Sequence, residues 1–271
     1  MNIQLSVVLI TLLVFAPLSK GKQQQLTSAE STVITIQVGA GVRPPFLIDN
    51  NKHQYQGAGP EILQALNQIQ QQFYFVMNEI PSKRKTAAVS DGRLDIIMWD
   101  NVNWGWRDES FVQSSELVRS KDIYFTFNDN NKSQDYFDNF NNKKLAMVIG
   151  YHYKVANFIV DIQTLKKNFN VTMVRNEEAS IRMAIAGRVD IAIVSETALN
   201  WYLLRFPQYT SKILIADKYD TQYSRHFVLP EDAAIKPFEI NNLLMLADKK
   251  GLLAPIYRKY GLVKPVTFIK H

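Results

Sequence analysis

The chain has 271 residues, a formal net charge of +6 and no cysteine. This length leaves room for two ordinary domains or one large one. The absence of cysteine excludes a disulfide framework and thiolate catalysis in this sequence. The lysines and arginines stand in scattered pairs and triplets without interleaved aromatic residues, which argues against a nucleic-acid partner.

The chain opens with an apolar stretch at residues 5–18, which is too short to span a bilayer comfortably. Ser19 and Gly21 place small residues at the spacing of a secretory cleavage site, and polar residues follow at once. We therefore expect residues 1–21 to be a signal peptide, residues 22–32 to be a polar N-terminal segment, and the mature chain to work in the periplasm. The alternative is an uncleaved anchor helix.

Strand and helix patterns alternate along the first half of the chain. Residues 33–38 are β-branched and partly alternating, which predicts a strand. Pro60 begins a segment with Ile62, Leu63 and Leu66 at helical spacing. The further predicted elements of this half are a strand at 73–76, a helix at 83–91 and a strand at 95–99. This βαβαβ order predicts an α/β fold with a mainly parallel sheet and right-handed crossovers.

The same alternation returns in the second half. A strand is predicted at 145–149 and a long helix at about 151–167. They are followed by a strand at 171–174, a helix from 178, a strand at 191–194, a helix at 195–206 and an extended segment at 212–216. Residues 227–230 then precede two helices at 237–250 and 252–260, each ended by a glycine.

One short sequence occurs twice. Gly92-Arg93-Leu94-Asp95-Ile96 returns as Gly187-Arg188-Val189-Asp190-Ile191, each time after a helical stretch and before an apolar run. Each copy predicts a helix ended by a glycine, then a short loop into a buried strand. Two copies in a chain of this size indicate two α/β lobes of similar build with a cleft between them.

Five short motifs follow one another between Val33 and Leu262. They are Pro45-Phe46 with Gly57, the twelve-residue spacing from Asp95 to Arg107, Gly150, Gly187 to Asp190, and the segment from Lys250 to Gly261. In this order they resemble the motifs of the family 3 periplasmic solute-binding proteins, which deliver polar amino acids to ABC importers. The resemblance implies a two-lobed type II periplasmic binding fold. Each lobe is then a mainly parallel sheet flanked by helices, and two hinge crossovers let the lobes close on a ligand.

The resemblance also implies the domain boundaries. Lobe 1 is expected at residues 30–120 together with 218–271, and lobe 2 at residues 121–217. The expected crossovers are residues 120–125 and 213–218, since they lie between the two repeated units and where the chain returns. A monomer is expected.

Arg107 stands at the position of the family's ligand-binding arginine, and a guanidinium meets a carboxylate through two parallel hydrogen bonds. The alternative is a surface arginine paired with Asp108 or Glu109. Phe46 belongs to the opening motif, and the resemblance places it at the ligand. Trp104 stands where the family usually has threonine, so an aromatic wall replaces a small hydroxyl.

Several further positions depart from the family pattern. Arg43 stands where the family has an aromatic residue, and Asp100 where a small residue offers its backbone. Ser195, with Glu196 beside it, stands in place of the aspartate that holds the ligand's ammonium group. Tyr151 replaces a threonine of the family's "G-T-T" loop. Either Asp100 or Glu196 is a candidate for the lost ammonium partner. Alternatively, Asp100 pairs with Arg43 and the site seeks anions.

These features predict binding of a small carboxylate-bearing solute, an amino acid or a derivative, for delivery to the membrane permease of an ABC importer, with no cofactor. We expect an aromatic or otherwise bulky carboxylate, or an acidic amino-acid derivative, to bind better than histidine, lysine or arginine. The competing interpretation is that Asp100 replaces the lost aspartate and that the ligand is an ordinary polar amino acid.

Two other functions stay open. One is a cleft enzyme resembling cyclohexadienyl dehydratases, in which Glu196 or Asp100 acts as the acid beside Arg107. The other is a ligand sensor without an importer. The four histidines show no metal-ligand spacing, and no nucleophile motif is present, which argues against other catalytic chemistry.

Overall fold

The computed structural model describes residues 32–50, 54–106, 110–128 and 132–268. The expected signal peptide at residues 1–21 lies outside this part of the chain. Within the described residues, no helix is long and apolar enough to cross a membrane.

The N-terminal strands form a parallel sheet. β1 (Ile34–Ala40) pairs with β4 (Phe73–Glu79) along its whole length and with β5 (Ile96–Asp100) at its end. α1 (Ala58–Gln68) packs against β4, and it fully buries Ile62 and Leu66, two of the residues whose spacing predicted a helix. The smaller elements of this region are β2 (Ile48–Asp49), β3 (Tyr55–Gln56), η1 (Ser82–Arg84), α2 (Lys85–Ser90) and β6 (Phe111–Gln113).

The middle of the chain builds a second parallel sheet. β8 (Leu145–Val148) lies between β9 (Val171–Val174) and β10 (Ile191–Ser195) and pairs with both in parallel. The helices of this region are α3 (Ile162–Asn168), α4 (Glu177–Ile185) and α5 (Glu196–Arg205), with short turns at η2 (Gln134–Phe137), η3 (Lys154–Ala156) and η4 (Pro207–Lys212).

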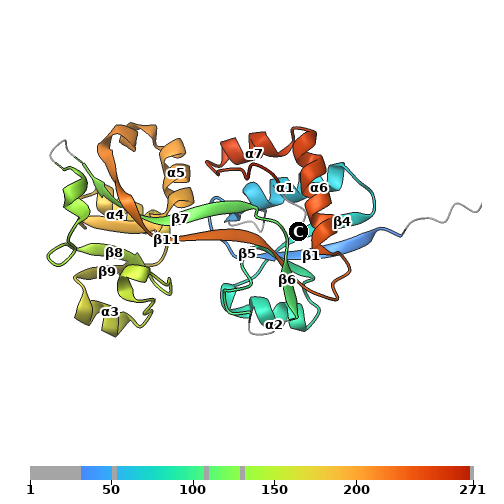
Figure 1. Ribbon diagram of the computed structural model, residues 1–271, viewed down its shortest axis with the longest axis horizontal. Helices are drawn as coiled ribbons and strands as arrows, with labels where there is room; N and C mark the ends of the chain where they lie inside the picture. The colour runs from blue at the N-terminus through green and yellow to red at the C-terminus, as the bar shows by residue number, and fades with distance from the viewer. Residues whose placement is uncertain (1–31, 51–53, 107–109, 129–131, 269–271) are drawn as a thin grey trace, which may run out of the picture. The chain divides into compact units, whose positions relative to one another are not determined.

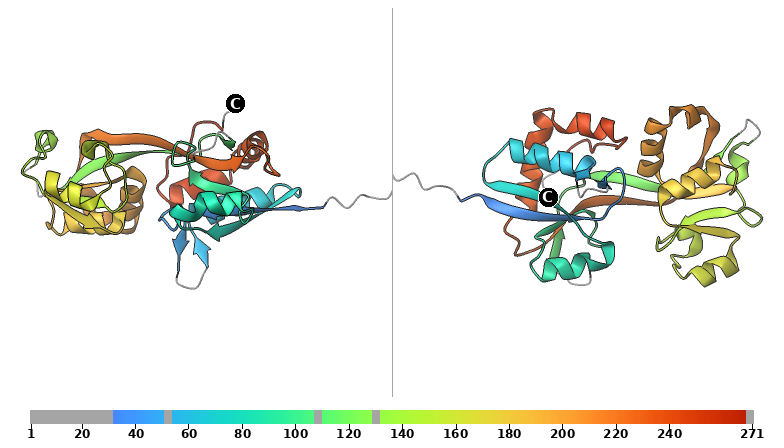
Figure 2. Two further views of the ribbon diagram at one scale, coloured as in Figure 1. Left: turned by 90° about the horizontal axis from the view of Figure 1, so that it is seen from below. Right: turned by 180° about the vertical axis from the view of Figure 1, so that it is seen from behind.

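Two long antiparallel strands join the sheets. β7 (Val118–Phe127) and β11 (Ile213–Pro230) run side by side in Figure 1, and Figure 2 shows the same pair from two other directions. Residues 213–215 of β11 pair near the end of β7, beside β10, whereas residues 226–230 pair with β5 and β6. The strand order is therefore β4-β1-β5-β11-β7-β10-β8-β9, a continuous path from one lobe to the other.

Each lobe buries apolar side chains on both faces of its sheet. In the first lobe the largest cluster joins β1, α1 and β5 to α6 (Pro237–Lys249) and α7 (Leu253–Lys259), and a smaller one lies under α2. In the second lobe, Phe125 faces the cluster of α4 and α5, while its neighbour Tyr124 faces the cluster of α3. Successive strand residues point to opposite faces, so both sheets are middle layers. The predicted two-lobed α/β fold is confirmed.

The repeated sequence has a structural role in both lobes. Gly92 and Gly187 end their helices with positive φ angles of 68° and 66°. Asp95 then accepts a hydrogen bond from the backbone N–H of Gln37 at 2.6 Å, and Asp190 accepts one from that of Lys144 at 2.7 Å. Each aspartate thus joins the start of one strand to the chain beside it.

The predicted long helix at 151–167 is wrong. This segment holds only η3 and α3, separated by Asn157 and Phe158, both of which have positive φ angles. Asp161 caps the true start of α3 by accepting the N–H of Thr164 at 2.8 Å. Near η3, tertiary hydrogen bonds to Asp220 fix the backbone instead.

Asp220 of β11 holds η3 in place. The pairing of β11 with β7 is irregular around Tyr219, and this irregularity leaves Asp220 unpaired in the ladder and buried. Its carboxylate accepts the N–H groups of Lys154 and Val155 at 2.6 and 2.8 Å and the hydroxyl of Tyr124 at 2.6 Å. One side chain therefore fixes the contact between the joining strand and the second lobe.

We expect Asp220→Ala to lower the free energy of unfolding by about 3 kcal/mol, because three donors lose their acceptor and the tyrosine hydroxyl is buried. Urea unfolding measures this change. Asp217→Ala is the matched control: it lies exposed on the same strand and should change stability by no more than about 0.5 kcal/mol. Equal effects of the two substitutions would contradict the role assigned to Asp220.

Candidate functional site

The candidate site starts from one face of the β7–β11 ladder. Thr221 pairs with Asp122 and Tyr223 with Ser120, so alternate residues of both strands share a face. Arg225 follows on the same face of β11. The hydroxyls of Thr221 and Tyr223 both donate to the Asp122 carboxylate at 2.9 Å. Ser120, Asp122 and Arg225 are buried although they are polar.

Asp122 is a buried acid, with a relative exposure of 7%. Burial raises the pKa of Asp122 to about 6, and the neighbouring charge of Glu177 adds to this shift. The hydrogen bonds from Tyr223 and Thr221 and the charge of Arg225 act in the opposite direction but do not cancel it. The charge of the site therefore changes near neutral pH.

Glu177 brings a second carboxylate to the same place from the second lobe. It lies in the first turn of α4, where Asn176 caps the helix by accepting the N–H of Ala179. Its Oε1 accepts the backbone N–H of Ser195 at 2.6 Å, and its Oε2 accepts the hydroxyl of Tyr151 at 3.4 Å. Glu177 thus accepts a hydrogen bond from the backbone of Ser195, the position at which the family resemblance led us to expect an aspartate.

Arg43 faces these groups from the first lobe. Its guanidinium lies 4.7 Å from the centre of the Tyr151 ring, in a cation–π arrangement. Burial by itself lowers the pKa of Arg43, but the surrounding acidic groups, led by Tyr151 and Glu177, raise it above its usual value. It makes no ion pair with a carboxylate of the described residues.

Arg225 is the most deeply buried cation of the site, with a relative exposure of 5%. Its guanidinium lies about equally far from three aromatic rings, at 4.9 Å from Trp104, 5.0 Å from Tyr223 and 5.2 Å from Phe46. Its Nη1 donates to the carbonyl oxygen of Trp99 at 3.0 Å. Its Nε is buried without a hydrogen-bond partner in the described part of the chain, and so is the hydroxyl of Ser120.

Trp99 holds Arg225 through an unusual backbone conformation. Its φ angle is +67°, which is rare for a bulky residue and costs free energy. The ring packs on Phe46 with centroids 4.7 Å apart. In this conformation the carbonyl of Trp99 accepts a hydrogen bond from the arginine.

We refer to Arg43, Asp122, Tyr151, Glu177, Tyr223 and Arg225 as the hinge cluster. Of the residues singled out from the sequence, Arg43 and Tyr151 belong to it, and Phe46 and Trp104 border it. Arg107 lies outside the described residues.

Three further residues singled out from the sequence lie outside the hinge cluster and have other contacts or positions: Asp100, Ser195 and Glu196. Asp100 forms an ion pair with Lys85 at 2.6 Å, so the pairing suggested with Arg43 is not found. Ser195 caps α5 by accepting the N–H of Ala198 at 3.2 Å. Glu196 is half-buried in the first turn of α5.

The sequence interpretation missed four members of the hinge cluster: Asp122, Glu177, Tyr223 and Arg225. Residues 221–225 read Thr-Gln-Tyr-Ser-Arg, without the apolar alternation that predicts a strand, and the segment was not predicted to be one. Glu177 reads as an ordinary helix-start acid, and only the tertiary contact with Ser195 identifies it.

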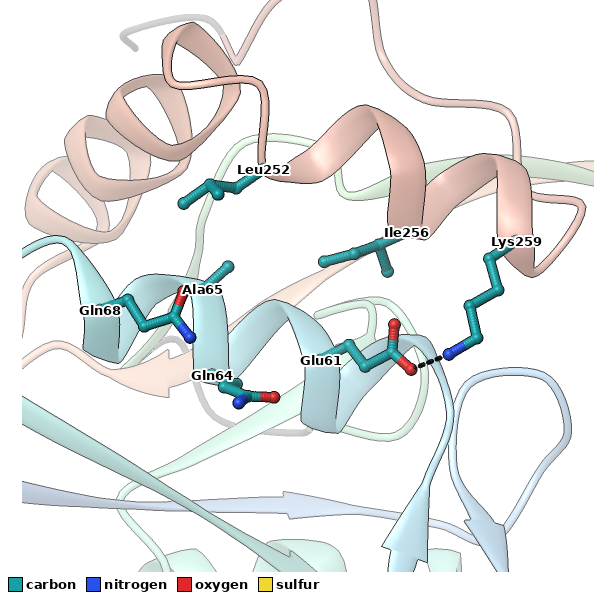
Figure 3. Close-up of a pocket in the computed structure, with 7 residues that line it drawn as sticks. All are labelled: Glu61, Gln64, Ala65, Gln68, Leu252, Ile256 and Lys259. Atoms are coloured by element: carbon teal, nitrogen blue, oxygen red, sulfur yellow. Dashed lines mark hydrogen bonds and ion pairs between the residues drawn. The ribbon is translucent and has the colours of Figure 1, made fainter.

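A hollow lies between α1 and α7 (Figure 3). It encloses about 290 Å³ and is lined by Glu61, Gln64, Ala65, Gln68, Leu252, Ile256 and Lys259 (Figure 3). An ion pair between Glu61 and Lys259 closes one end. Its lining shares no residue with the hinge cluster. The described residues contain no group of acidic residues and histidines that suits a metal ion.

No model of a known protein family matches the chain, and no curated protein matches it. Among solved structures, the chain is similar to the L-cystine solute receptor of Neisseria gonorrhoeae in its unliganded open conformation (17% identity, TM-score 0.62, covering 88% of this chain and 97% of that one). It is also similar to the ligand-binding core of GluR0 from Nostoc punctiforme in complex with L-glutamate (18% identity, TM-score 0.60, covering 83% and 98%). A third is a histidine kinase sensor domain that resembles periplasmic binding proteins (17% identity, TM-score 0.62, covering 86% and 99%). The chain therefore has the two-lobed fold of the periplasmic binding proteins.

Proposed function

We propose that the chain binds a small carboxylate-bearing solute, an amino acid or a derivative, at the hinge cluster. The observation that supports this is the pair of guanidinium groups, Arg43 and Arg225, which face the cluster without a carboxylate partner among the described residues. Guanidinium groups bind carboxylates through paired, charge-assisted hydrogen bonds. Proteins of the same fold include a cystine receptor and a glutamate-bound core.

Glu177 is our proposed partner for a ligand ammonium group. Its carboxylate accepts a hydrogen bond from the backbone N–H of Ser195, the residue that stands in place of the expected aspartate. A carboxylate has room for more acceptor contacts than the two that Glu177 makes. Of the two candidates predicted from the sequence, Asp100 is paired with Lys85, and Glu196 is half-buried in the first turn of α5.

We further propose that the two lobes close on this ligand about the β7–β11 ladder, with lobe boundaries within these strands. Two contacts already link α5 to the end of α7: Asn200 Nδ2 donates to the carbonyl of Gly261 at 3.4 Å, and the rings of Trp201 and Tyr260 lie 5.4 Å apart. The mature protein then acts as a periplasmic monomer that delivers its solute to the permease of an ABC importer.

A second candidate function is ligand sensing without an importer. It is supported by the histidine kinase sensor domain of the same fold. The dehydratase-like enzyme has weaker support, because Asp100, one of its two candidate acids, is held by Lys85. Accumulation of product from prephenate or arogenate would favour the enzyme over both binding functions.

Ligand binding is tested by a thermal-shift screen of amino acids and small carboxylates with the mature chain. A ligand that binds only the folded state raises the melting temperature, by an amount that grows with its concentration. X-ray scattering with the best ligand should show a compaction. No shift with any carboxylate would contradict the proposal.

Arg107 remains a proposed contact of a ligand carboxylate, which it would share with a guanidinium of the hinge cluster. We expect Arg107→Ala to weaken binding of the best ligand by roughly 2–5 kcal/mol, the range for breaking a desolvated charge pair, with little change in stability. Isothermal titration measures the loss. Arg93→Ala, which removes an exposed arginine of the same lobe, is the control. Unchanged affinity in Arg107→Ala would remove this residue from the site.

Asp122 should make the stability of the protein depend on pH. Its carboxyl holds a proton up to about pH 6 in the folded state, against an ordinary pKa of 3.8. Between these values the folded state binds more protons than the unfolded state, so the free energy of unfolding falls as the pH rises. A shift of about two units corresponds to about 3 kcal/mol.

We expect Asp122→Asn to remove this fall. The melting temperature of the variant should therefore rise relative to that of the wild type as the pH increases from 4 to 7. Thermal unfolding across this range measures the difference. Asp217→Asn, an exposed change on β11, should follow the wild-type curve. Parallel curves for Asp122→Asn and the wild type would show that Asp122 is not a buried, titrating acid.

A further inference from the structure

Arg225 combines features that its packing alone does not explain. It lies on β11, the strand shared by the two lobes, and almost none of its surface reaches solvent. A buried cation is stable only where paired charges or hydrogen bonds replace its water. Its one described hydrogen bond is to the carbonyl of Trp99, and no carboxylate of the described residues lies within ion-pair distance.

The rings around Arg225 fix its position without neutralising it. Trp104, Tyr223 and Phe46 each face the guanidinium at about 5 Å. Aromatic faces attract a cation but leave its N–H groups available to an acceptor in the plane of the guanidinium. The unpartnered Nε is such a donor.

Arg43 offers a second guanidinium of the same kind, stacked on Tyr151 instead. One short turn connects the two arginines: the backbone N–H of Phe46 donates to the carbonyl of Arg43 at 2.9 Å, and the Phe46 ring lies 5.2 Å from the guanidinium of Arg225. The two carboxylates of the hinge cluster do not neutralise them at contact distance. Asp122 is held by the hydroxyls of Thr221 and Tyr223, and Glu177 by a backbone N–H and a hydroxyl.

Neither guanidinium of the hinge cluster lies within ion-pair distance of a carboxylate of the described residues, so both can still pair with a carboxylate of a ligand. A ligand with a single carboxylate and an ammonium group matches one of the two cations. A ligand with a second carboxylate matches both.

We propose that Arg225 and Arg43 each bind one carboxylate of the ligand, so that the protein selects small molecules with two carboxylates. This inference rests on the proposed function, because it concerns the same site. One of the two carboxylate contacts is thereby made by Arg225, a residue of the joining strand β11. An amino group, where the ligand has one, meets Glu177.

The experiment compares acid and amide pairs of equal shape, L-glutamate with L-glutamine and L-aspartate with L-asparagine, together with glutarate and succinate. Titration calorimetry with the mature wild-type chain should show one acid binding at least about tenfold more tightly than its amide. Glutarate and succinate show whether the ammonium group contributes.

Arg225→Gln should weaken binding of the preferred acid by roughly 30-fold or more and abolish its advantage over the amide. Arg225→Lys, which keeps the charge, should retain part of that advantage. Arg43→Gln removes the second contact at a half-buried position and should reduce the same ratio. Arg119→Gln, on the same ladder but exposed, is the matched control and should leave binding unchanged.

Melting temperatures are measured for every variant. Where Arg225→Gln does not fold, the ratios of Arg225→Lys and Arg43→Gln decide. An amide that binds as well as its acid, or an acid preference that survives loss of either arginine, overturns the assignment while leaving a carboxylate-binding protein. Failure of every amino acid and dicarboxylate to bind overturns the proposed function as well.

Discussion

The antiparallel pairing of β7 with β11 is the interaction on which the other features depend. Its backbone hydrogen bonds connect a parallel sheet in each lobe, and its side chains alternate between the two faces. One face therefore carries Asp122, Tyr223 and Arg225 at spacings that the ladder itself enforces. The strands that join the lobes therefore also supply side chains of the candidate site.

The electrostatics of the hinge cluster follow from burial. Charges that are removed from water interact more strongly, and an unpaired one is costly. In this site the acids are stabilised by hydroxyl and N–H donors, and the guanidinium groups by aromatic faces. Neither kind of partner removes the charge. The side chains are thus held in position while their attraction for an oppositely charged group is kept, which lowers the ordering cost of binding.

The features predicted correctly from the sequence are those that depend on residues close together along the chain. Helical spacing located α1, and the repeated glycines located two helix ends, because both signals lie within a few residues. Residues 151–167 were misjudged because Asp220, far along the chain, fixes the backbone at Lys154 and Val155. The site was harder still. Glu177 reaches Ser195 only after α4 has packed on β10, so its role is absent from any local pattern.

The repeated aspartates have a consequence for how such chains can diverge. Asp95 and Asp190 each tie the strand they precede to the neighbouring chain, and neither belongs to the hinge cluster. Side chains of the hinge cluster can therefore be exchanged without removing these two contacts. The aspartates that support the fold and the side chains of the candidate site are thus different residues. For this reason a chain can keep this fold while the side chains of its candidate site change.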